Sequence, residues 1–413
     1  MKKSYRAAVE FALKWKSCYA QHNERFFADN IDFWRDIFPG NMGGSVAALS
    51  EGERCSESFK AGVLVPSFKD KDIVTFRDSY FDINQRNNRV IPTVGRFYPR
   101  SFAYRALNCF KGDMNPFRIV KKDQGMLVGD TNHPLAKFPL TLEAAFIEKI
   151  KFFEERGGSC NYIPEMVANN GPGMQIPYSG NCADKLYEQS NSQIDTDFYS
   201  IYPFKRENED DDSIFYKSPK MVNHLDDTAI SQVTAIYSKL LPSGCKVLDL
   251  MSSWVSHLPD SSQPYKVTGL GLNEEELKAN RQLSDFVVHD LNTNPKLPFK
   301  DGEFDAVICT ASIEYLIKPL EVIEEVARVV KSGGLFITTF SDRWFPGKQI
   351  IQWSQLHEFE RLGLVLDYFI KSEKFENLNT ESVRGLPRPV YDKHIRERAC
   401  SDPIFAVWGN VKS

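Results

Sequence analysis

The pattern of apolar and polar residues divides the chain into segments of different texture. Near the N-terminus, apolar residues recur at spacings of three to four up to Pro39-Gly40, which predicts a helical segment over residues 1–40. In residues 41–151, short segments rich in Val, Phe, Tyr and Ile alternate with Gly, Pro, Asn and Asp, which is typical of an antiparallel β domain. The strands predicted there are 61–65, 72–76, 117–120, 125–128 and 140–147.

Residues 152–225 have the composition of a linker or lid. They carry Gly-Pro-Gly at 171–173, many Asn and Ser residues, and an acidic run over 207–212. Such a charge run is usually solvated coil. The segment 221–226, just upstream of the next predicted helix, is a candidate lid.

Residues 226–413 alternate strands and helices. A helix is predicted from Asp226 or Asp227 to Leu240, and a second from Pro319 to Lys331. The intervening apolar strands read as continuously buried, which indicates an α/β domain with a mostly parallel sheet covered on both faces. The predicted strands are 246–250, 265–270, 286–289, 304–309 and 335–340.

Composition narrows the class of protein. A chain of 413 residues predicts roughly two to three domains. Lys and Arg total 51 against 55 Asp and Glu, so no basic surplus points to a nucleic acid, and we consider such a partner unlikely. The eight cysteines are scattered singly, without a Cys-x-x-Cys pair or a Cys/His cluster, so we expect no metal site and a reducing compartment. No apolar run approaches the ~20 residues of a membrane span. We therefore expect a soluble cytoplasmic protein with no membrane partner, and the sequence leaves its oligomeric state open.

The ends of the predicted parallel strands carry the candidate chemistry, because ligands of such sheets bind outside the carboxyl ends of the strands. The first strand leads into Asp249-Leu250-Met251-Ser252-Ser253, and the second into Gly271-Leu272-Asn273. The third strand is followed by Asp290-Leu291, and the fourth by Thr310 and the run from Ser312 to Leu316.

This ordered set resembles the class I S-adenosylmethionine-dependent methyltransferases of the UbiE-like, type 11 group, over residues 226 to about 345. The resemblance implies a Rossmann-like methyltransferase domain at 226–413 and S-adenosyl-L-methionine as the cofactor. It implies that Asp249 anchors the cofactor's amino-acid end, and that Asp290 and the backbone of Leu291 bind adenine. Residues Thr310 to Glu314 would line the methyl and substrate side. The acceptor is expected to be a small molecule or a protein.

The sequence departs from the family pattern in two ways. Met251, Ser253 and Val255 stand where glycines normally let the backbone approach the ligand. The hydroxyls of Ser252 and Ser253 are the candidate replacements. Asn273 stands where a carboxylate usually holds the ribose, and an amide loses on the order of 1 kcal/mol relative to a charge-assisted pair. Cofactor binding is therefore predicted, but weaker than usual.

Each candidate also has a structural interpretation. Asp249 and Asn273 are both suited to cap a following helix, and Ser252 and Ser253 are common turn residues. His257 is a candidate general base or cofactor contact, or a structural hydrogen-bonding residue. Glu314 is a candidate catalytic group facing the substrate, or part of a surface loop. A dinucleotide fingerprint is absent, because Glu274 stands at its third glycine position.

Residues 95–151 carry a second resemblance, to the SlyD-like FKBP-type prolyl isomerases. Its specific part is Asn132-His133-Pro134-Leu135-Ala136, followed by Lys137 where that family has Gly. This implies an FKBP-like β domain over 41–151 that binds a partner or protein substrate rather than an active isomerase. The string is also compatible with a tight turn between strands. As an alternative for the whole chain, it is a non-catalytic interaction or chaperone-like protein that retains a degenerate methyltransferase fold.

Overall fold

The computed structural model describes residues 6–85, 88–150, 159–176, 196–260 and 263–413. The chain forms two compact units. The first, here called the N-terminal unit, comprises residues 1–24, 28–201 and 359–363, and the C-terminal unit comprises 25–27, 202–358 and 364–413. The predicted linker or lid over 152–225 lies partly outside the described residues.

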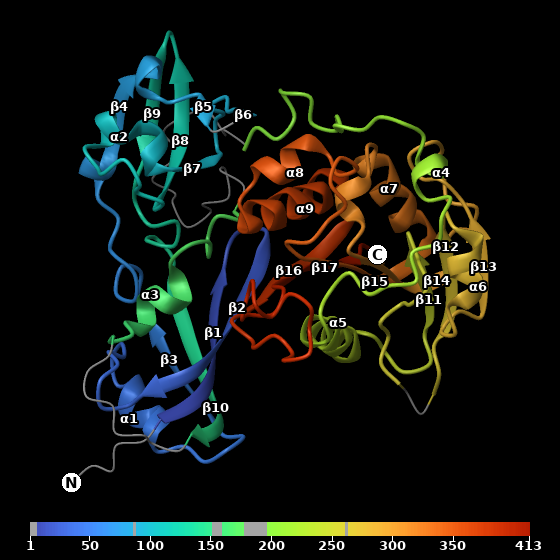
Figure 1. The fold of residues 1–413 in the computed structure, drawn as a ribbon, viewed down its shortest axis with the longest axis horizontal. Coiled ribbons are helices and arrows are strands. Elements are labelled where there is room, and N and C mark those ends of the chain that lie inside the picture. Colours follow the sequence, from blue (N-terminus) through green and yellow to red (C-terminus); the bar gives the residue numbers. More distant parts are fainter. Residues whose placement is uncertain (1–5, 86–87, 151–158, 177–195, 261–262) are drawn as a thin grey trace. The chain divides into compact units, whose positions relative to one another are not determined.

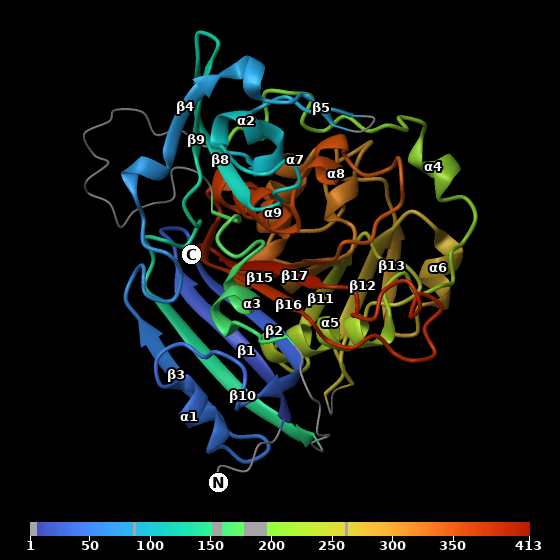
Figure 2. The ribbon, with the colours of Figure 1, turned by 60° about the vertical axis from the view of Figure 1, so that its left-hand side comes forward.

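The described residues of the N-terminal unit include two larger sets of antiparallel strands and the short antiparallel pair β5-β6. In the first, β1 lies between β2 and β10, and β10 pairs with β3 (Figure 2). The second has the order β4-β9-β8-β7 and packs on an aromatic core that includes Phe81, Tyr98 and Phe117. The strands are β1 (Arg6–Lys16), β2 (Ala20–Asp32), β3 (Arg54–Phe59), β4 (Ile73–Arg77), β5 (Asn84–Gln85), β6 (Asn88–Arg89), β7 (Phe97–Pro99), β8 (Pro116–Asp123), β9 (Met126–Asp130) and β10 (Leu140–Ile150). The helices are α1 (Met42–Ala47), α2 (Tyr104–Leu107) and α3 (Ile163–Ala168).

The helix predicted over residues 1–40 is wrong, because β1 and β2 occupy this part of the chain. Strand β1 is buried on both of its faces from Arg6 to Leu13, apart from the half-buried Glu10. A strand buried on both faces loses its polar–apolar alternation, and its apolar residues then imitate helical spacing. The strand predicted at 61–65 is also wrong: this segment is a turn in which Gly62 has a φ of +75°.

The Asn132-His133-Pro134 string forms a fastened loop within the N-terminal unit. The Asn132 side chain accepts a hydrogen bond from the Lys69 N–H at 2.8 Å and donates one to the Lys69 carbonyl at 3.0 Å. His133 Nδ1 accepts from the Leu135 N–H, so Nε2 carries the proton toward the Ala168 carbonyl 3.1 Å away. These contacts agree with the turn interpretation, and the FKBP-like resemblance stays a prediction.

The C-terminal unit is built on one mixed sheet of order β13-β12-β11-β14-β15-β17-β16 (Figure 1). Strands β13, β12, β11, β14 and β15 are parallel, as the sequence predicts. Strand β17 is antiparallel to both β15 and β16. The strands are β11 (Lys246–Leu250), β12 (Lys266–Gly271), β13 (Asp285–Val288), β14 (Phe304–Thr310), β15 (Val330–Phe340), β16 (Phe375–Arg384) and β17 (Ile404–Val411). The helices are α4 (Asp212–Phe215), α5 (Asp227–Leu240), α6 (Glu274–Ala279), α7 (Pro319–Val329), α8 (Ile351–Gln355) and α9 (Glu358–Ser372).

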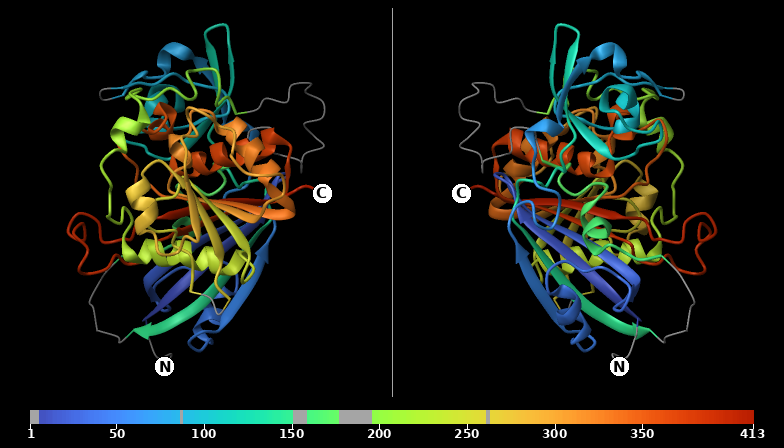
Figure 3. Two further views of the ribbon diagram at one scale, coloured as in Figure 1. Left: turned by 90° about the vertical axis from the view of Figure 1, so that its right-hand side faces the viewer. Right: turned by 90° about the vertical axis from the view of Figure 1, so that its left-hand side faces the viewer.

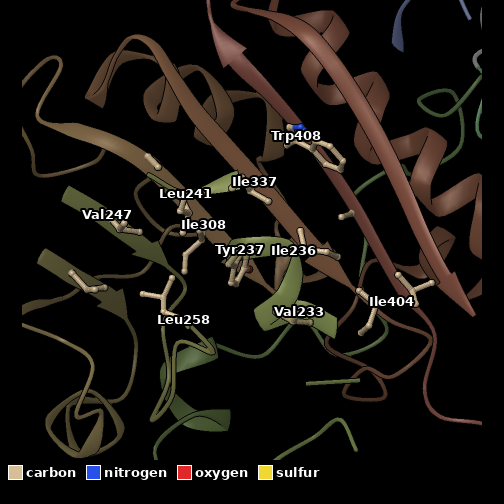
Figure 4. Close-up of a cluster of buried hydrophobic side chains, with 14 of the residues drawn as sticks. Val233, Ile236, Tyr237, Leu241, Val247, Leu258, Ile308, Ile337, Ile404 and Trp408 are labelled. Atoms are coloured by element: carbon tan, nitrogen blue, oxygen red, sulfur yellow. The ribbon is translucent and has the colours of Figure 1, made fainter. Parts of the chain in front are cut away.

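Helices cover both faces of this sheet. In Figure 3, α5 (yellow-green) lies on one face and the orange helices α7 and α8 lie on the other. Helix α5 begins at the predicted N-cap, where the Asp226 carboxylate accepts from the Ala229 N–H at 3.1 Å. Its buried side chains, among them Val233 and Tyr237, pack on the sheet residues Ile308 and Ile337 (Figure 4). The site therefore stands on a rigid, two-sided sheet.

Two further findings bear on cellular context. Along the described residues, none of the helices combines the length and hydrophobicity needed to cross a bilayer. Cys18 is disulfide-bonded, and the reducing compartment stays a prediction. Within the described ranges, Cys55, Cys109, Cys160, Cys245, Cys309 and Cys400 are free cysteines.

Candidate functional site

A cavity lies at the carboxyl ends of the parallel strands of the C-terminal unit. It is lined by segments that follow β11, β12, β13 and β14, the edge at which sheets of this type bind ligands. Its volume is about 160 Å³. Since one water needs only about 10–15 Å³ on this measure, the cavity has room for a small organic molecule. Among the sequence candidates, its lining includes Asp249, Ser252, Ser253, His257, Asn273, Asp290, Leu291 and Thr310.

Asp249 is the most buried charged group of the cavity, with 3% of its surface exposed. Its Oδ2 atom accepts hydrogen bonds from the hydroxyls of Ser252 and Ser256, both at 2.6 Å. Burial raises the pKa of Asp249 to about 6, although the two serine hydroxyls act in the opposite direction. The side chain is therefore a desolvated carboxylate at neutral pH, held in place by two donors.

The loop after β11 approaches the end of β12 closely, although it lacks the glycines that the family pattern places in this loop. The Ser252 N–H donates to the Leu270 carbonyl at 2.7 Å, which draws the loop after β11 against this strand. A Cβ at Gly271 would lie 2.2 Å from the Ser252 carbonyl oxygen. Met251, at the first expected glycine position, still has a left-handed φ of +57°. The loop thus keeps a glycine-like turn without glycine, because Gly271 provides the space.

Gly271→Ala is expected to destabilise the C-terminal unit by about 1–3 kcal/mol, the usual result of overpacking. Its Cβ would meet backbone rather than a side chain that can rotate away. Urea unfolding followed by circular dichroism measures the loss. Gly44→Ala is the control, because a Cβ at this position of α1 meets nothing within 4 Å. Equal stability of the two variants would contradict the close approach.

Asn273 has the structural role that the sequence left open. Its side-chain oxygen caps α6 by accepting from the Glu276 N–H at 3.0 Å, and its amide nitrogen donates to the Tyr216 carbonyl at 2.8 Å. The sequence analysis missed Glu276, which also lines the cavity. The Glu276 carboxylate accepts from the Ser253 hydroxyl at 2.5 Å and from the Lys220 N–H at 2.7 Å. A carboxylate is therefore present beside the position where the family has one, on the first turn of α6.

The turn after β13 is organised by Asp290. One of its oxygens accepts from the Asn292 N–H at 2.8 Å, and the other accepts from the Thr293 hydroxyl at 2.8 Å. Leu291 is buried and contributes an apolar wall. Asp290 thus shapes the loop as well as facing the cavity.

The two catalytic candidates differ in position. His257 lines the cavity, and burial lowers its pKa to about 4, so its imidazole is neutral at physiological pH. Glu314 is fully buried and is not among the residues that line the cavity, and its catalytic role stays a prediction. The short 3₁₀ turn Ile313–Tyr315 brings Tyr315 to the cavity instead. Spacing after a strand does not specify which side chain of a 3₁₀ turn faces the ligand edge.

A segment preceding α5 completes the cavity. We call residues 206–225 the strap. Its residues Asp212, Tyr216, Lys220 and Val222 to Leu225 line the cavity, so the predicted lid segment does reach the site. Trp254, from the loop after β11, donates through Nε1 to the Val222 carbonyl at 3.3 Å.

The strap is anchored by a buried ion cluster. The Asp212 carboxylate contacts the guanidinium of Arg206 at 2.8 Å, the ammonium of Lys348 at 3.0 Å and the amide of Asn292 at 2.9 Å. Burial by itself would raise the pKa of Asp212, but the hydrogen bonds from these three side chains outweigh it and hold the pKa below its ordinary value. The expectation that the acidic run 207–212 is solvated coil is therefore wrong at Asp212.

Backbone strain gathers around the cavity. Met251, His257 and Ala311 have φ values of +57°, +54° and +46°, and all three line it. Non-glycine residues in this region of φ each cost about 1–2 kcal/mol, and they concentrate at functional sites. The strain supports a functional interpretation of the cavity.

Comparisons with known proteins agree with this location. A family model described as a methyltransferase domain matches residues 251–338. An uncharacterized protein of Methanocaldococcus jannaschii is 41% identical over 64 residues, which are 15% of this chain and 31% of that protein, so the match spans under a third of its length.

The solved structures found include methyltransferases. A chain of the Haloferax volcanii complex between the Trm112 methyltransferase activator and a protein described as a methyltransferase is 16% identical, with a TM-score of 0.33. The match covers 45% of this chain and 92% of that one. A methyltransferase of Aquifex aeolicus described as dependent on S-adenosylmethionine is 17% identical, with a TM-score of 0.30, over 46% of this chain and 91% of that one.

Proposed function

We propose that the C-terminal unit is an S-adenosylmethionine-dependent methyltransferase. The observation that carries this proposal is the buried, serine-held carboxylate of Asp249 at the carboxyl edge of the sheet, beside the residues that match the methyltransferase family. The cavity fits such a cofactor chemically. It combines carboxylates for hydroxyl and amino groups, the apolar Leu272 and Leu291 for a flat ring, and the aromatic face of Trp254.

Each lining group has a proposed role. Asp249 holds the cofactor's amino-acid end through Ser252, to which it is hydrogen-bonded. Ser253, whose hydroxyl donates to Glu276, lies beside it in the same loop. Asp290 with the Leu291 backbone binds the adenine. Glu276 supplies the carboxylate for the ribose hydroxyls that Asn273, occupied as a helix cap, does not. When bound, S-adenosylmethionine supplies an electrophilic methyl group on a sulfonium sulfur.

The chain's own contribution is alignment and exclusion of water. Methyl transfer needs little acid–base assistance, so positioning the acceptor in a dry cavity is the main requirement. The strap covers the cavity from its own anchor at Asp212. The imidazole of His257 is neutral at physiological pH, and its pKa of about 4 makes it a weak proton acceptor, so the role proposed for it is a contact with the cofactor rather than proton transfer.

Calorimetric titration of the full chain with S-adenosylhomocysteine tests the proposal. We expect saturable binding, and we expect Asp290→Ala to weaken it at least tenfold while the chain stays folded. Asp285→Ala is the matched control, because Asp285 lies at the opposite end of the same strand and is exposed. Absence of binding at millimolar ligand would rule out the enzyme. Equal affinity of the two variants would refute the adenine position.

One observation favours a second candidate, a non-catalytic interaction protein that retains the fold. The strap already occupies polar groups of the cavity: the Lys220 backbone N–H donates to the Glu276 carboxylate, and the Tyr216 carbonyl accepts from the Asn273 amide. Under this alternative the strap is a permanent part of the fold and the same titration gives no heat.

For the N-terminal unit we keep the proposal of an accessory binding role in place of isomerase activity. It is supported by the use of the Asn132 and His133 side chains to fasten their own loop.

A further inference from the structure

Lys220 places its ammonium among three aromatic rings. Its Nζ atom lies 4.1 Å from the ring centre of Phe215, 4.9 Å from that of Tyr216 and 5.1 Å from that of Phe345. The same atom donates a hydrogen bond to the Phe215 carbonyl at 3.2 Å. Distances below about 6 Å over a ring face are those of cation–π contacts.

The three rings form a box, here called the cage. The planes of Phe215 and Tyr216 meet at 81°, those of Phe215 and Phe345 at 72°, and those of Tyr216 and Phe345 at 78°. Three nearly perpendicular faces enclose a rounded cation better than stacked rings do, because each presents its negative face inward. Tyr216, Phe345 and Lys220 also line the cavity of the proposed cofactor.

The binding mode of Lys220 differs from that of the neighbouring structural lysine. Lys348 is almost fully buried and forms an ion pair with Asp212 at 3.0 Å. The Lys348 ammonium also lies 5.4 Å from the ring centre of Phe215, but a carboxylate holds it, whereas the ammonium of Lys220 contacts three rings and the neutral Phe215 carbonyl. Burial lowers the pKa of Lys220, while the charge of Glu276 acts against that decrease. A primary ammonium loses strong hydration in such a box, whereas an alkylated ammonium, which is weakly hydrated, loses less.

We propose that the cage is the recognition site for an alkylated ammonium group of the methyl acceptor, and that Lys220 is an internal occupant which the acceptor displaces. The proposal rests on the methyltransferase function proposed above and assigns its substrate class: a cationic amine. Phe215, Tyr216 and Lys220 all belong to the strap, whereas Phe345 follows β15. Displacement therefore needs two movements: the Lys220 side chain rotates out of the cage, and the strap opens far enough to separate its two rings from Phe345. When the strap closes again, the three rings surround the acceptor.

Titration with tetramethylammonium chloride tests the cage without any cofactor. Removing the internal occupant in Lys220→Ala is expected to produce saturable millimolar binding, at least tenfold tighter than in the unmodified chain. Adding Phe345→Leu to this variant keeps an apolar side chain but removes one ring face, and it is expected to lower the affinity at least tenfold. Sodium chloride at equal ionic strength and tert-butanol, an uncharged molecule of similar shape, are the control ligands. If Lys220→Ala fails to fold, Lys220→Ser opens the same space.

The two proposals fail separately in this design. Each variant is also titrated with S-adenosylhomocysteine. Binding of S-adenosylhomocysteine without any binding of tetramethylammonium by the lysine variants overturns the cage and leaves the methyltransferase standing. Binding of tetramethylammonium with equal affinity by the unmodified chain, or equal binding of tert-butanol, also overturns it. Binding of tetramethylammonium without binding of S-adenosylhomocysteine would support the cage as a cation site and refute the proposed methyltransferase function.

Discussion

Asp249→Asn is expected to stabilise the folded chain at pH 7.5 by up to about 3 kcal/mol, although the residue belongs to the proposed cofactor site. Burial raises the pKa of Asp249 from its ordinary 3.8 to about 6. At pH 7.5 the ionised carboxylate therefore lowers the stability of the folded state relative to the unfolded state. The amide is uncharged, and its oxygen is still able to accept from the hydroxyls of Ser252 and Ser256. Affinity for S-adenosylhomocysteine is expected to fall at the same time, which is a trade-off between stability and function.

The dependence on pH has a defined sign. As the pH rises above about 4, the unfolded chain loses the Asp249 proton while the folded chain retains it, so the stability of the unmodified protein decreases until about pH 6. The stability difference between Asp249→Asn and the unmodified chain should therefore shrink to about half at pH 5. Urea unfolding of both proteins at pH 5 and pH 7.5 measures this difference.

Asp305→Asn is the control for that experiment. Asp305 lies near the start of β14 and its carboxylate binds the Lys331 ammonium at 2.6 Å, which keeps the pKa of Asp305 below its ordinary value. Its amide variant is expected to be neutral or slightly destabilising at pH 7.5. If Asp249→Asn behaved in the same way, the buried carboxylate would carry no penalty and the proposed trade-off would be wrong.

Much of the C-terminal sheet was predictable from the sequence because its strands are covered on both faces. Strands such as β11 and β14 appear as short apolar runs between helices with clear caps, and the order of such elements implies parallel pairing. The same property misled the interpretation of β1. Strand β1 is not flanked by predicted helices that would have identified it as a strand of a covered sheet. Its partner β10 lies more than a hundred residues away in the chain. Pairing across that distance leaves no local signal.

The candidate site was predictable only where it follows the strands. Asp249, Asp290 and Thr310 were found because strand ends of a parallel sheet share one edge. The strap was not found in detail, because it has no periodicity and its role depends on contacts that the sequence does not encode locally. Asp212 shows the reason. Within an acidic run it is expected to be solvated, and only its ion pairs with Arg206 and Lys348 offset the desolvation cost of burying its carboxylate. The burial of Glu276 was not predictable either, because it follows two exposed glutamates and the sequence does not distinguish it from them.

Asp212→Ala is expected to release the strap while the sheet stays folded. The change leaves the guanidinium of Arg206 and the ammonium of Lys348 buried without their shared carboxylate, and breaking a buried pair in this way costs about 3–5 kcal/mol. The strap adds little to the apolar core, so the loss is expected to appear as local opening rather than global unfolding.

Hydrogen–deuterium exchange measures this opening. Peptides from 206–225 should exchange at least a hundredfold faster in Asp212→Ala, while peptides covering β11 and β14 keep their protection. Asp210→Ala is the matched control, because the Asp210 side chain is exposed and Lys348 contacts only its backbone carbonyl. Because the pKa of Asp212 is lowered in the folded state, acidification toward pH 4 and below should open the strap of the unmodified chain in the same region. Uniform acceleration across the sheet would mean that the strap is an integral part of the fold, and a cage that opens by strap movement would then have no route for its acceptor.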